Sequence, residues 1–189
     1  MVGISGASGV QYGIRLLQVL RERGCIVHVI ITDSARSIIG IETDIRPEEL
    51  ERLASCAYGP WEFTAPVASG SHAFDAMVVI PCSMGTLSGI ARGSSETLIT
   101  RTADVCLKER RRLILVIRET PLSLVQLRNM VEAAEAGAII LPASPAFYSR
   151  PKSVEDIVDV IVGRVLDLLG ISNDLYPRWR GWSEGRKRL

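Results

Sequence analysis

Short apolar runs alternate with longer amphipathic stretches along the chain. The runs are rich in Val, Ile and Leu without polar alternation, as in strands that are buried on both faces of a parallel sheet. The longer stretches place apolar residues at helical spacing, and several carry capping signals at their ends. The expected strands are residues 2–5, 26–32, 76–81, 113–118 and 138–141. The expected helices are residues 10–23, 34–41, 47–56, 84–91, 96–110, 122–136 and 154–169.

This alternation predicts an α/β fold: a single doubly wound, Rossmann-like or flavodoxin-like parallel sheet with helices on both faces. We expect residues 1–176 to form one domain and residues 177–189 to form a basic tail with five basic residues and one acid. In such a sheet, ligands bind at the carboxyl ends of the strands near a topological switch point. The loops that follow the expected strands are therefore the places to look for chemistry.

Composition and charge exclude several classes of protein. The chain has 189 residues, 47% hydrophobic and 23% charged, which is too apolar for disorder and sufficient for a core. No apolar stretch approaches the roughly 20 residues of a membrane-spanning helix. The net charge of +1 argues against nucleic acid as a partner. Because no targeting signal is visible and the four cysteines are widely spaced, we expect a cytoplasmic protein with reduced thiols and no zinc site.

Two loops have the composition of anion sites. Residues 5–9, SGASG, follow an expected strand and open a helix, so their N–H groups and hydroxyls can hold a phosphate at the positive helix end. The spacing matches neither the dinucleotide fingerprint nor the P-loop, and a tight turn that only packs is the alternative. Residues 81–86, PCSMGT, repeat the pattern and suit an anion or the polar edge of a ring.

Charged residues elsewhere are less specific. Arg118 and Glu119 end a buried strand, where an ion-forming pair is costly unless it meets a ligand or counter-charges; a structural salt bridge is the alternative. Lys108 opens a basic run typical of a solvated helix end, and Glu42 is equivocal. A nucleophilic role for Cys82 is disfavoured, because neither histidine lies in a loop that follows a strand.

Taken together, these segments resemble one family over nearly the whole chain. In order and at the family's intervals stand GISGASGVQYGIRLLQVL, IETD, PCSMGTLSGIA, TRTADVCLKERRRLILVIRETPLSL, GAIILPASPAFYSRPKSVEDIVDVIVGRVLDLLGI and PRW. The chain is similar to the UbiX family of flavin prenyltransferases, formerly described as phenylacrylic acid or 3-octaprenyl-4-hydroxybenzoate decarboxylases. The resemblance implies a flavoprotein domain that joins the dimethylallyl group of dimethylallyl phosphate to N5 and C6 of reduced FMN. It also implies a dodecamer, and a UbiD-type decarboxylase in ubiquinone synthesis or phenolic acid breakdown as recipient of the prenylated FMN.

The resemblance also assigns residues to roles. Two departures from the family pattern are a shorter segment before the first strand and Gly85 where many relatives have Lys. The residues implied to contact FMN are Gly6, Ala7, Ser8, Thr32, Ser83, Met84, Gly85, Thr86 and Arg118. Those implied to bind the prenyl phosphate or border it are Tyr148, Arg164, Lys108, Arg101 and Trp179, and the catalytic set is Glu119, Lys108, Glu42 and Ser8.

The allylic phosphate must lose its C–O bond, so charge on the leaving phosphate has to be stabilised. No DDxxD cluster for Mg²⁺ is present, which favours a metal-free site that uses Lys108, Arg164 and Tyr148, with Glu119 as acid and base. For Arg164 the alternative is an ion pair with Asp167 or Asp156 on its own helix. Tyr148 could likewise simply pack on the sheet edge.

Three other functions remain open from the sequence. An FMN-dependent decarboxylase would be expected to carry an active-site histidine. A non-catalytic FMN carrier would keep the two loops without requiring Tyr148, Arg164 and Lys108 together. An NAD-dependent oxidoreductase could place Asp33 on a ribose but lacks the glycine fingerprint.

Overall fold

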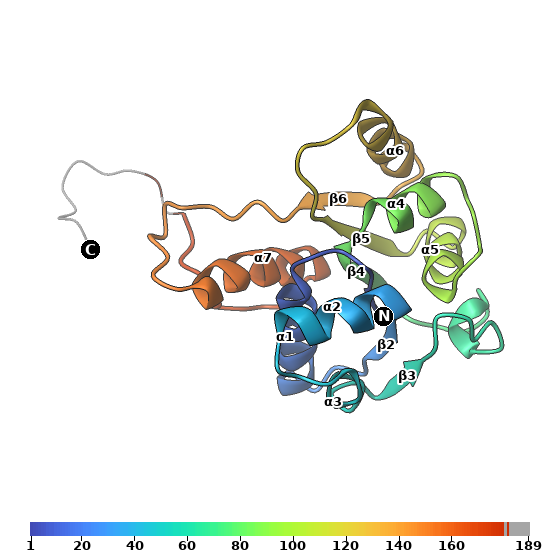
Figure 1. The fold of residues 1–189 in the computed structure, drawn as a ribbon, viewed down its shortest axis with the longest axis horizontal. Helices are drawn as coiled ribbons and strands as arrows, with labels where there is room; N and C mark the ends of the chain where they lie inside the picture. The colour runs from blue at the N-terminus through green and yellow to red at the C-terminus, as the bar shows by residue number, and fades with distance from the viewer. Residues whose placement is uncertain (180, 182–189) are drawn as a thin grey trace. The chain divides into compact units, whose positions relative to one another are not determined.

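The computed structural model describes residues 1–179 and 181, which form two compact units, Met1–Ala143 and Ser144–Leu189 (Figure 1). Most of the expected basic tail, residues 180 and 182–189, lies outside the described residues. That residues 1–176 form one domain stays a prediction.

The first unit contains a six-stranded sheet in which every pairing is parallel, in the order β3-β2-β1-β4-β5-β6. The chain builds outward from β1 to β3, returns to β4 beside β1, and then builds outward in the other direction. The topological switch point therefore lies between β1 and β4. The strands are β1 Val2–Ile4, β2 His28–Ile31, β3 Cys56–Tyr58, β4 Ala76–Cys82, β5 Arg112–Ile117 and β6 Ile139–Pro142.

Helices cover both faces of this sheet, as the sequence predicts. A Cβ on Gly3 of β1 would lie 3.3 Å from Ile99 of α5, whereas a Cβ on Gly13 of α1 would lie 3.1 Å from Ile4, the next residue of β1. Since successive strand residues point to opposite faces, α1 and α5 pack on opposite sides. The helices of this unit are α1 Val10–Glu22, α2 Asp33–Glu42, α3 Pro47–Glu51, the 3₁₀ turn η1 Pro66–Ala68, α4 Met84–Ala91, α5 Leu98–Lys108 and α6 Leu124–Glu135. The second unit contains α7, Val154–Leu169.

The apolar core explains why the central strands lack polar alternation. On the face of α4 and α5, side chains from β4 and β5 interdigitate with helix residues, all buried. Burial of this layer stabilises the fold by roughly 25 cal/mol per Å² of apolar surface removed from water. The members include Met77, Val79, Leu113, Leu115, Leu87, Ile90, Leu98 and Ile99.

One strand contradicts the sequence prediction. The helix expected over residues 47–56 ends at Glu51, and Cys56–Tyr58 forms the edge strand β3, which pairs with β2 from His28 onward. Two of its three residues are exposed. A strand this short, without a buried apolar run, shows no apolar pattern that would predict it from the sequence.

Candidate active site

The loops that follow β2, β1, β4 and β5 emerge side by side at the carboxyl edge of the sheet, because these strands are neighbours. Ser5, fully buried at the switch point, joins two of them. Its Oγ donates to the Pro81 carbonyl at 2.8 Å and accepts from the Ser83 N–H at 2.8 Å. Sequence reasoning missed this role, although a serine directly after a buried strand at the switch point was a usable signal.

The loop after β1 approaches the start of α2 very closely. A Cβ on Gly6 would lie 2.6 Å from the Cβ of Ser34, so only glycine permits the approach. Thr32 caps α2: its Oγ1 accepts from the Ala35 N–H at 3.1 Å and lies 3.1 Å from the Ser34 Oγ. Two hydroxyls at a positive helix end beside a glycine loop form an anion-binding arrangement. Ser34 was also missed from the sequence.

Glu42 pairs with the start of α1. Its Oε2 accepts hydrogen bonds from the N–H groups of Gly9 at 2.8 Å and Val10 at 3.2 Å. The first N–H groups of α1 are therefore paired with a carboxylate, which would repel a phosphate at the same place. That the 5–9 loop holds a phosphate stays a prediction, and the hydroxyls of Thr32 and Ser34 at α2 are further candidate groups for an anion.

Arg118 reaches from the end of β5 to the loop after β1, where its Nε donates to the Ser8 carbonyl at 2.9 Å. A Cβ on Gly9, whose φ is +96°, would lie 3.8 Å from Arg118 Cγ. Burial raises the pKa of Tyr12, and the Arg118 charge acts in the opposite direction. A guanidinium is thus held beside the switch point, where it can attract an anion.

The loop after β4 presents an open helix start. Ser83 caps α4, accepting from the Thr86 N–H at 3.4 Å and donating to the Thr86 Oγ1 at 3.1 Å. A Cβ built on Gly85 would meet no atom within 4 Å. The first turn of α4 can therefore receive a flat group against its backbone.

Glu119 is exposed at the same edge, and its Oε1 accepts from the Thr120 N–H at 3.0 Å. Among the described residues, Glu119 makes no ion pair with Arg118, which instead points to Ser8. The alternative of a structural salt bridge between the two has no support. The Glu119 carboxylate is accessible to a ligand.

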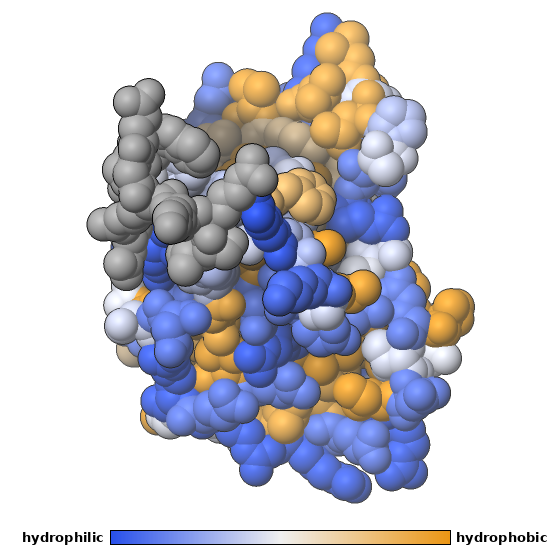
Figure 2. Space-filling model, turned by 90° about the vertical axis from the view of Figure 1, so that its left-hand side faces the viewer, coloured by the Kyte–Doolittle hydropathy of each residue, from blue (hydrophilic) through white to orange (hydrophobic). Residues whose placement is uncertain are grey.

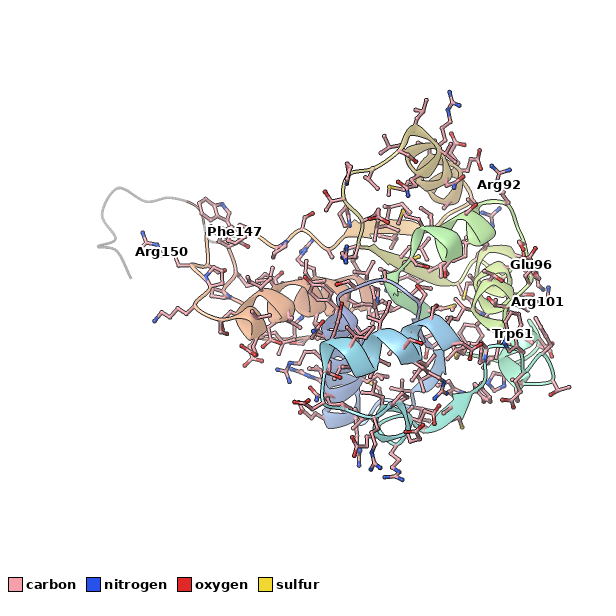
Figure 3. All side chains as sticks on the ribbon, in the orientation of Figure 1. Trp61, Arg92, Glu96, Arg101, Phe147 and Arg150 are labelled. Carbon is pink, nitrogen blue, oxygen red and sulfur yellow. The ribbon has the colours of Figure 1, made fainter. Side chains whose placement is uncertain are left out.

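Lys108 and Arg101 do not join this group within the chain. Lys108 ends α5 just before β5 begins, at the amino edge, and its Nζ lies 2.6 Å from the Glu109 Oε1. Arg101 donates to the Ala68 carbonyl at 3.0 Å and to the Asp104 Oδ2 at 3.0 Å. Figure 3 shows Arg101 on the outer side of α5.

The second unit contains the other three predicted substrate residues. The rings of Tyr148 and Trp179 meet edge to face with centroids 5.4 Å apart. Arg164, exposed on α7, donates to the Asp167 Oδ2 at 3.2 Å, so the expected alternative of an ion pair on its own helix is present.

Residues needed by the competing functions lie elsewhere. His28 begins β2 at the amino edge, its Nδ1 lies 3.0 Å from the Tyr58 hydroxyl, and its ring centroid lies 5.7 Å from that of His72. The chain has no other histidine, so none reaches the carboxyl-edge loops. Burial raises the pKa of the Cys82 thiol, which disfavours a thiolate nucleophile. Asp33, which an NAD-dependent oxidoreductase could place on a ribose, accepts a hydrogen bond from the Trp61 Nε1 at 3.2 Å.

The described residues contain no group of three His, Cys, Asp or Glu side chains that could hold a metal ion. No helix in that part of the chain combines the length and the apolar character needed to cross a membrane.

Residues 1–166 match the protein family described as Flavoprotein. The chain is 53% identical over 181 residues to the flavin prenyltransferase UbiX of Methanothermobacter thermautotrophicus, covering 96% of this chain and 95% of the relative. It is 48% identical over 184 residues to UbiX of Escherichia coli K12, covering 96% and 97%. The chain belongs to the UbiX family.

Solved structures of UbiX proteins agree with this assignment. AnUbiX (PadA1), in complex with FMN and dimethylallyl pyrophosphate, has a TM-score of 0.94 and 47% identity, with 96% of this chain and 97% of that chain covered. A dodecameric FMN-dependent UbiX-like decarboxylase from E. coli O157:H7 has a TM-score of 0.93 and 42% identity, with 95% and 98% covered.

As a UbiX family member, the chain has residues that fit FMN. The hydroxyls of Thr32 and Ser34 and the Arg118 guanidinium suit its phosphate, and the open turn at Gly85 suits its ring.

Proposed function

We propose that the protein transfers the dimethylallyl group of dimethylallyl phosphate to N5 and C6 of reduced FMN and so makes prenylated FMN. One observation carries the proposal. Arg118, Glu119 and the hydroxyl-bearing loops converge on one edge of the sheet, in a chain that matches flavin prenyltransferases over 96% of its length.

The first unit supplies the FMN-binding groups. Arg118 and Thr32 bind the phosphate, and the open first turn of α4 receives the ring, which when bound and reduced supplies the electron-rich atoms that are alkylated. Glu42 acts indirectly in this proposal: by pairing with the N–H groups of Gly9 and Val10, it fixes the loop that contains Ser8. The other proposed FMN contacts are Gly6, Ala7, Ser83, Met84, Gly85 and Thr86.

The prenyl donor needs stabilisation of its leaving phosphate. Arg164 and Lys108 supply positive charge and Tyr148 supplies a hydroxyl; each donor contributes on the order of 2–4 kcal/mol to the transition state. Glu119 gives a proton to the leaving phosphate oxygen and takes the proton that N5 loses on alkylation; it then gives that proton to the prenyl double bond and takes the proton that C6 loses as the new ring closes. We assign this work to its Oε2, because Oε1 accepts the Thr120 N–H.

A homo-oligomer completes the site in this proposal. Lys108 lies at the amino edge of the sheet, opposite Glu119, so we assign Lys108 and Arg101 to the site of a neighbouring copy in a dodecamer like that of the E. coli O157:H7 relative. An exposed apolar surface is available for assembly: α6 turns its large side chains outward, visible as hydrophobic atoms at the top of Figure 2. This α6 surface consists of Leu124, Val125, Leu127 and Val131.

The product's use and location belong to the same proposal. A UbiD-type decarboxylase in the cytoplasm receives the prenylated FMN, since alkylation at N5 and C6 produces a modified flavin that only an enzyme built for it can use.

The second candidate is a non-catalytic FMN carrier, and the engagement of Arg164 by Asp167 is the observation that favours it. Release of inorganic phosphate separates the two functions. We expect phosphate to be released from dimethylallyl phosphate only when reduced FMN is present. A carrier would release none under either condition, and that result would contradict the proposed enzyme.

A further inference from the structure

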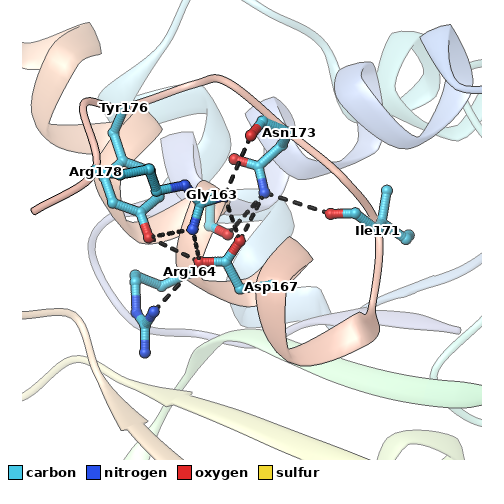
Figure 4. A network of polar contacts seen from close by, with 7 residues as sticks. All are labelled: Gly163, Arg164, Asp167, Ile171, Asn173, Tyr176 and Arg178. Carbon is cyan, nitrogen blue, oxygen red and sulfur yellow. Dashed lines mark hydrogen bonds and ion pairs between the residues drawn. The ribbon is translucent and has the colours of Figure 1, made fainter. Parts of the chain in front are cut away.

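A network of polar contacts at the end of α7 connects Arg164 to the chain segment before Trp179 (Figure 4). Its centre is Asp167, whose side chain is 19% exposed. The donors to this carboxylate are Arg178 Nη1 at 2.5 Å, Arg178 Nη2 at 2.6 Å, the Tyr176 hydroxyl at 2.7 Å, Asn173 Nδ2 at 2.9 Å and Arg164 Nη1 at 3.2 Å.

The two arginines share this carboxylate unequally. Arg178 binds both of its oxygens, donates to the Asn173 carbonyl at 3.2 Å and lies over the Tyr176 ring at 4.7 Å. Arg164 makes one longer bond, and its side chain is 54% exposed. A bidentate pair is the stronger of the two. Arg178 is therefore the main counter-ion of Asp167. Arg164 makes the weaker pair with this carboxylate, and the Tyr176 hydroxyl together with Asp167 raises the pKa of Arg164.

The backbone around Arg164 is fixed by the same segment. A Cβ on Gly163 would lie 2.4 Å from the Tyr176 ring, so the ring packs directly on the turn of α7 that precedes Arg164. Asn173 Nδ2 donates to the Gly163 carbonyl at 3.2 Å. Burial raises the pKa of Asp167, but hydrogen bonds from Arg178, Tyr176 and Asn173 outweigh it and lower the pKa to about 2. The carboxylate is therefore ionised at neutral pH and would compete with a phosphate for any arginine beside it.

We propose that Arg178 is a positioning residue: by binding both oxygens of Asp167, it leaves Arg164 with one longer bond to this carboxylate, which the phosphate of the prenyl donor can replace. This inference rests on the proposed function and gives a role to the arginine of the Pro-Arg-Trp segment. Trp179, the next residue along the chain, contacts Tyr148.

Three variants test it: Arg178→Gln, Asp167→Asn and the double variant. In Arg178→Gln the carboxylate turns to Arg164, so we expect the KM for dimethylallyl phosphate to rise about tenfold, the scale of one charged hydrogen bond, with a smaller change in kcat. In the double variant the competing carboxylate is gone, and the KM falls back toward the wild-type value. FMN affinity, measured by fluorescence titration, stays unchanged in all three.

The recovery distinguishes positioning from a structural role. If Arg178 only holds the segment against α7, the double variant binds substrate as weakly as Arg178→Gln or more weakly, and that result overturns the proposal. A wild-type KM in Arg178→Gln overturns it as well. Arg178→Lys, which keeps a cation on Asp167, should lie between, and Arg92→Gln, an exposed arginine of the other unit, should leave the KM unchanged.

Calorimetry with inorganic phosphate repeats the comparison without turnover. We expect the same order of affinities: wild type strongest, the double variant next and Arg178→Gln weakest. Because this measurement needs no reaction, a failure of wild-type protein to alkylate FMN would contradict the proposed function alone. If Arg178→Gln binds phosphate as well as wild type, only the proposed role of Arg178 is contradicted, and the proposed function is not.

Discussion

At the scale of residues, Arg118 and Glu119 are adjacent in the sequence, but their side chains have different partners. Arg118 is committed to the Ser8 carbonyl, whereas Glu119 is exposed and bonded only to the following N–H in the part of the chain that is described. This separation suits the proposed function, in which Arg118 binds an anion and Glu119 moves protons.

The variant Glu119→Gln tests the proton-transfer role. The amide keeps the shape and the bond to the Thr120 N–H but cannot exchange a proton, so we expect FMN affinity to stay and prenylation to slow by roughly 10²–10⁴-fold. Single-turnover rates with bound reduced FMN measure this. An unchanged rate would limit Glu119 to a structural role.

Two glycines near the FMN groups should respond differently to alanine. A Cβ on Gly6 would lie 2.2 Å from the Ser34 Oγ, so Gly6→Ala should lower the free energy of unfolding by about 1–3 kcal/mol and reduce FMN binding. Gly85 faces open space, so Gly85→Ala should keep the stability and weaken only FMN. Denaturant titration with and without FMN compares them; equal stability losses would contradict the packing described here.

At the scale of elements, the sequence predicted the long helices from the apolar period of one buried face. It predicted the central strands from their continuous apolar runs, which are buried on both faces. That the loops after the strands share the carboxyl edge followed from a parallel sheet, whereas the strand order that makes the loops after β1, β2, β4 and β5 neighbours comes from the structure. The role of Glu42 did not follow: its contact with Gly9 joins positions 33 residues apart and depends on where α2 ends in space. The strand β3 was not predicted, because it is short and largely exposed.

The end of α7 carries a pH dependence. The pKa of Asp167 in the folded protein is lowered to about 2, below the value of about 4 in an unfolded chain. Its stabilising contribution is therefore complete above about pH 4 and is lost as the pH falls toward 2. We expect the difference in melting temperature between wild type and Asp167→Asn to be largest near neutral pH and to shrink below pH 4. A difference that stays constant down to pH 2 would contradict the ion pairs at Asp167.

At the scale of the whole molecule, α6 leaves several of its large apolar side chains exposed. It buries only Asn129 and Ala133, while its larger apolar side chains are exposed, Leu124 at 61% and Val131 at 55%. An apolar helix face of this kind marks an interaction surface. In the proposed function this assembly is needed for catalysis, because Lys108 and Glu119 lie at opposite edges of the sheet and Lys108 acts in the site of a neighbouring copy.

The variant Leu127→Glu tests this surface. A charge on the α6 surface should break the assembly into smaller species, measured by light scattering, and should reduce prenylation because Lys108 of a neighbour is lost. Ile26→Glu is the matched control, since Ile26 is 81% exposed away from α6 and should leave the assembly intact. An assembly of unchanged mass in Leu127→Glu would exclude α6 as the interface.

The mass of the flavin extracted after reaction tests the central claim most directly. Purified protein is incubated anaerobically with reduced FMN and dimethylallyl phosphate in the presence of EDTA, and the released flavin is analysed by mass spectrometry. We predict FMN heavier by one C₅H₈ unit, formed without added metal and absent when Glu119→Gln replaces the wild type over the same short reaction time. Recovery of unmodified FMN from the wild-type protein, with and without Mg²⁺, would contradict the assignment of this chain as a flavin prenyltransferase.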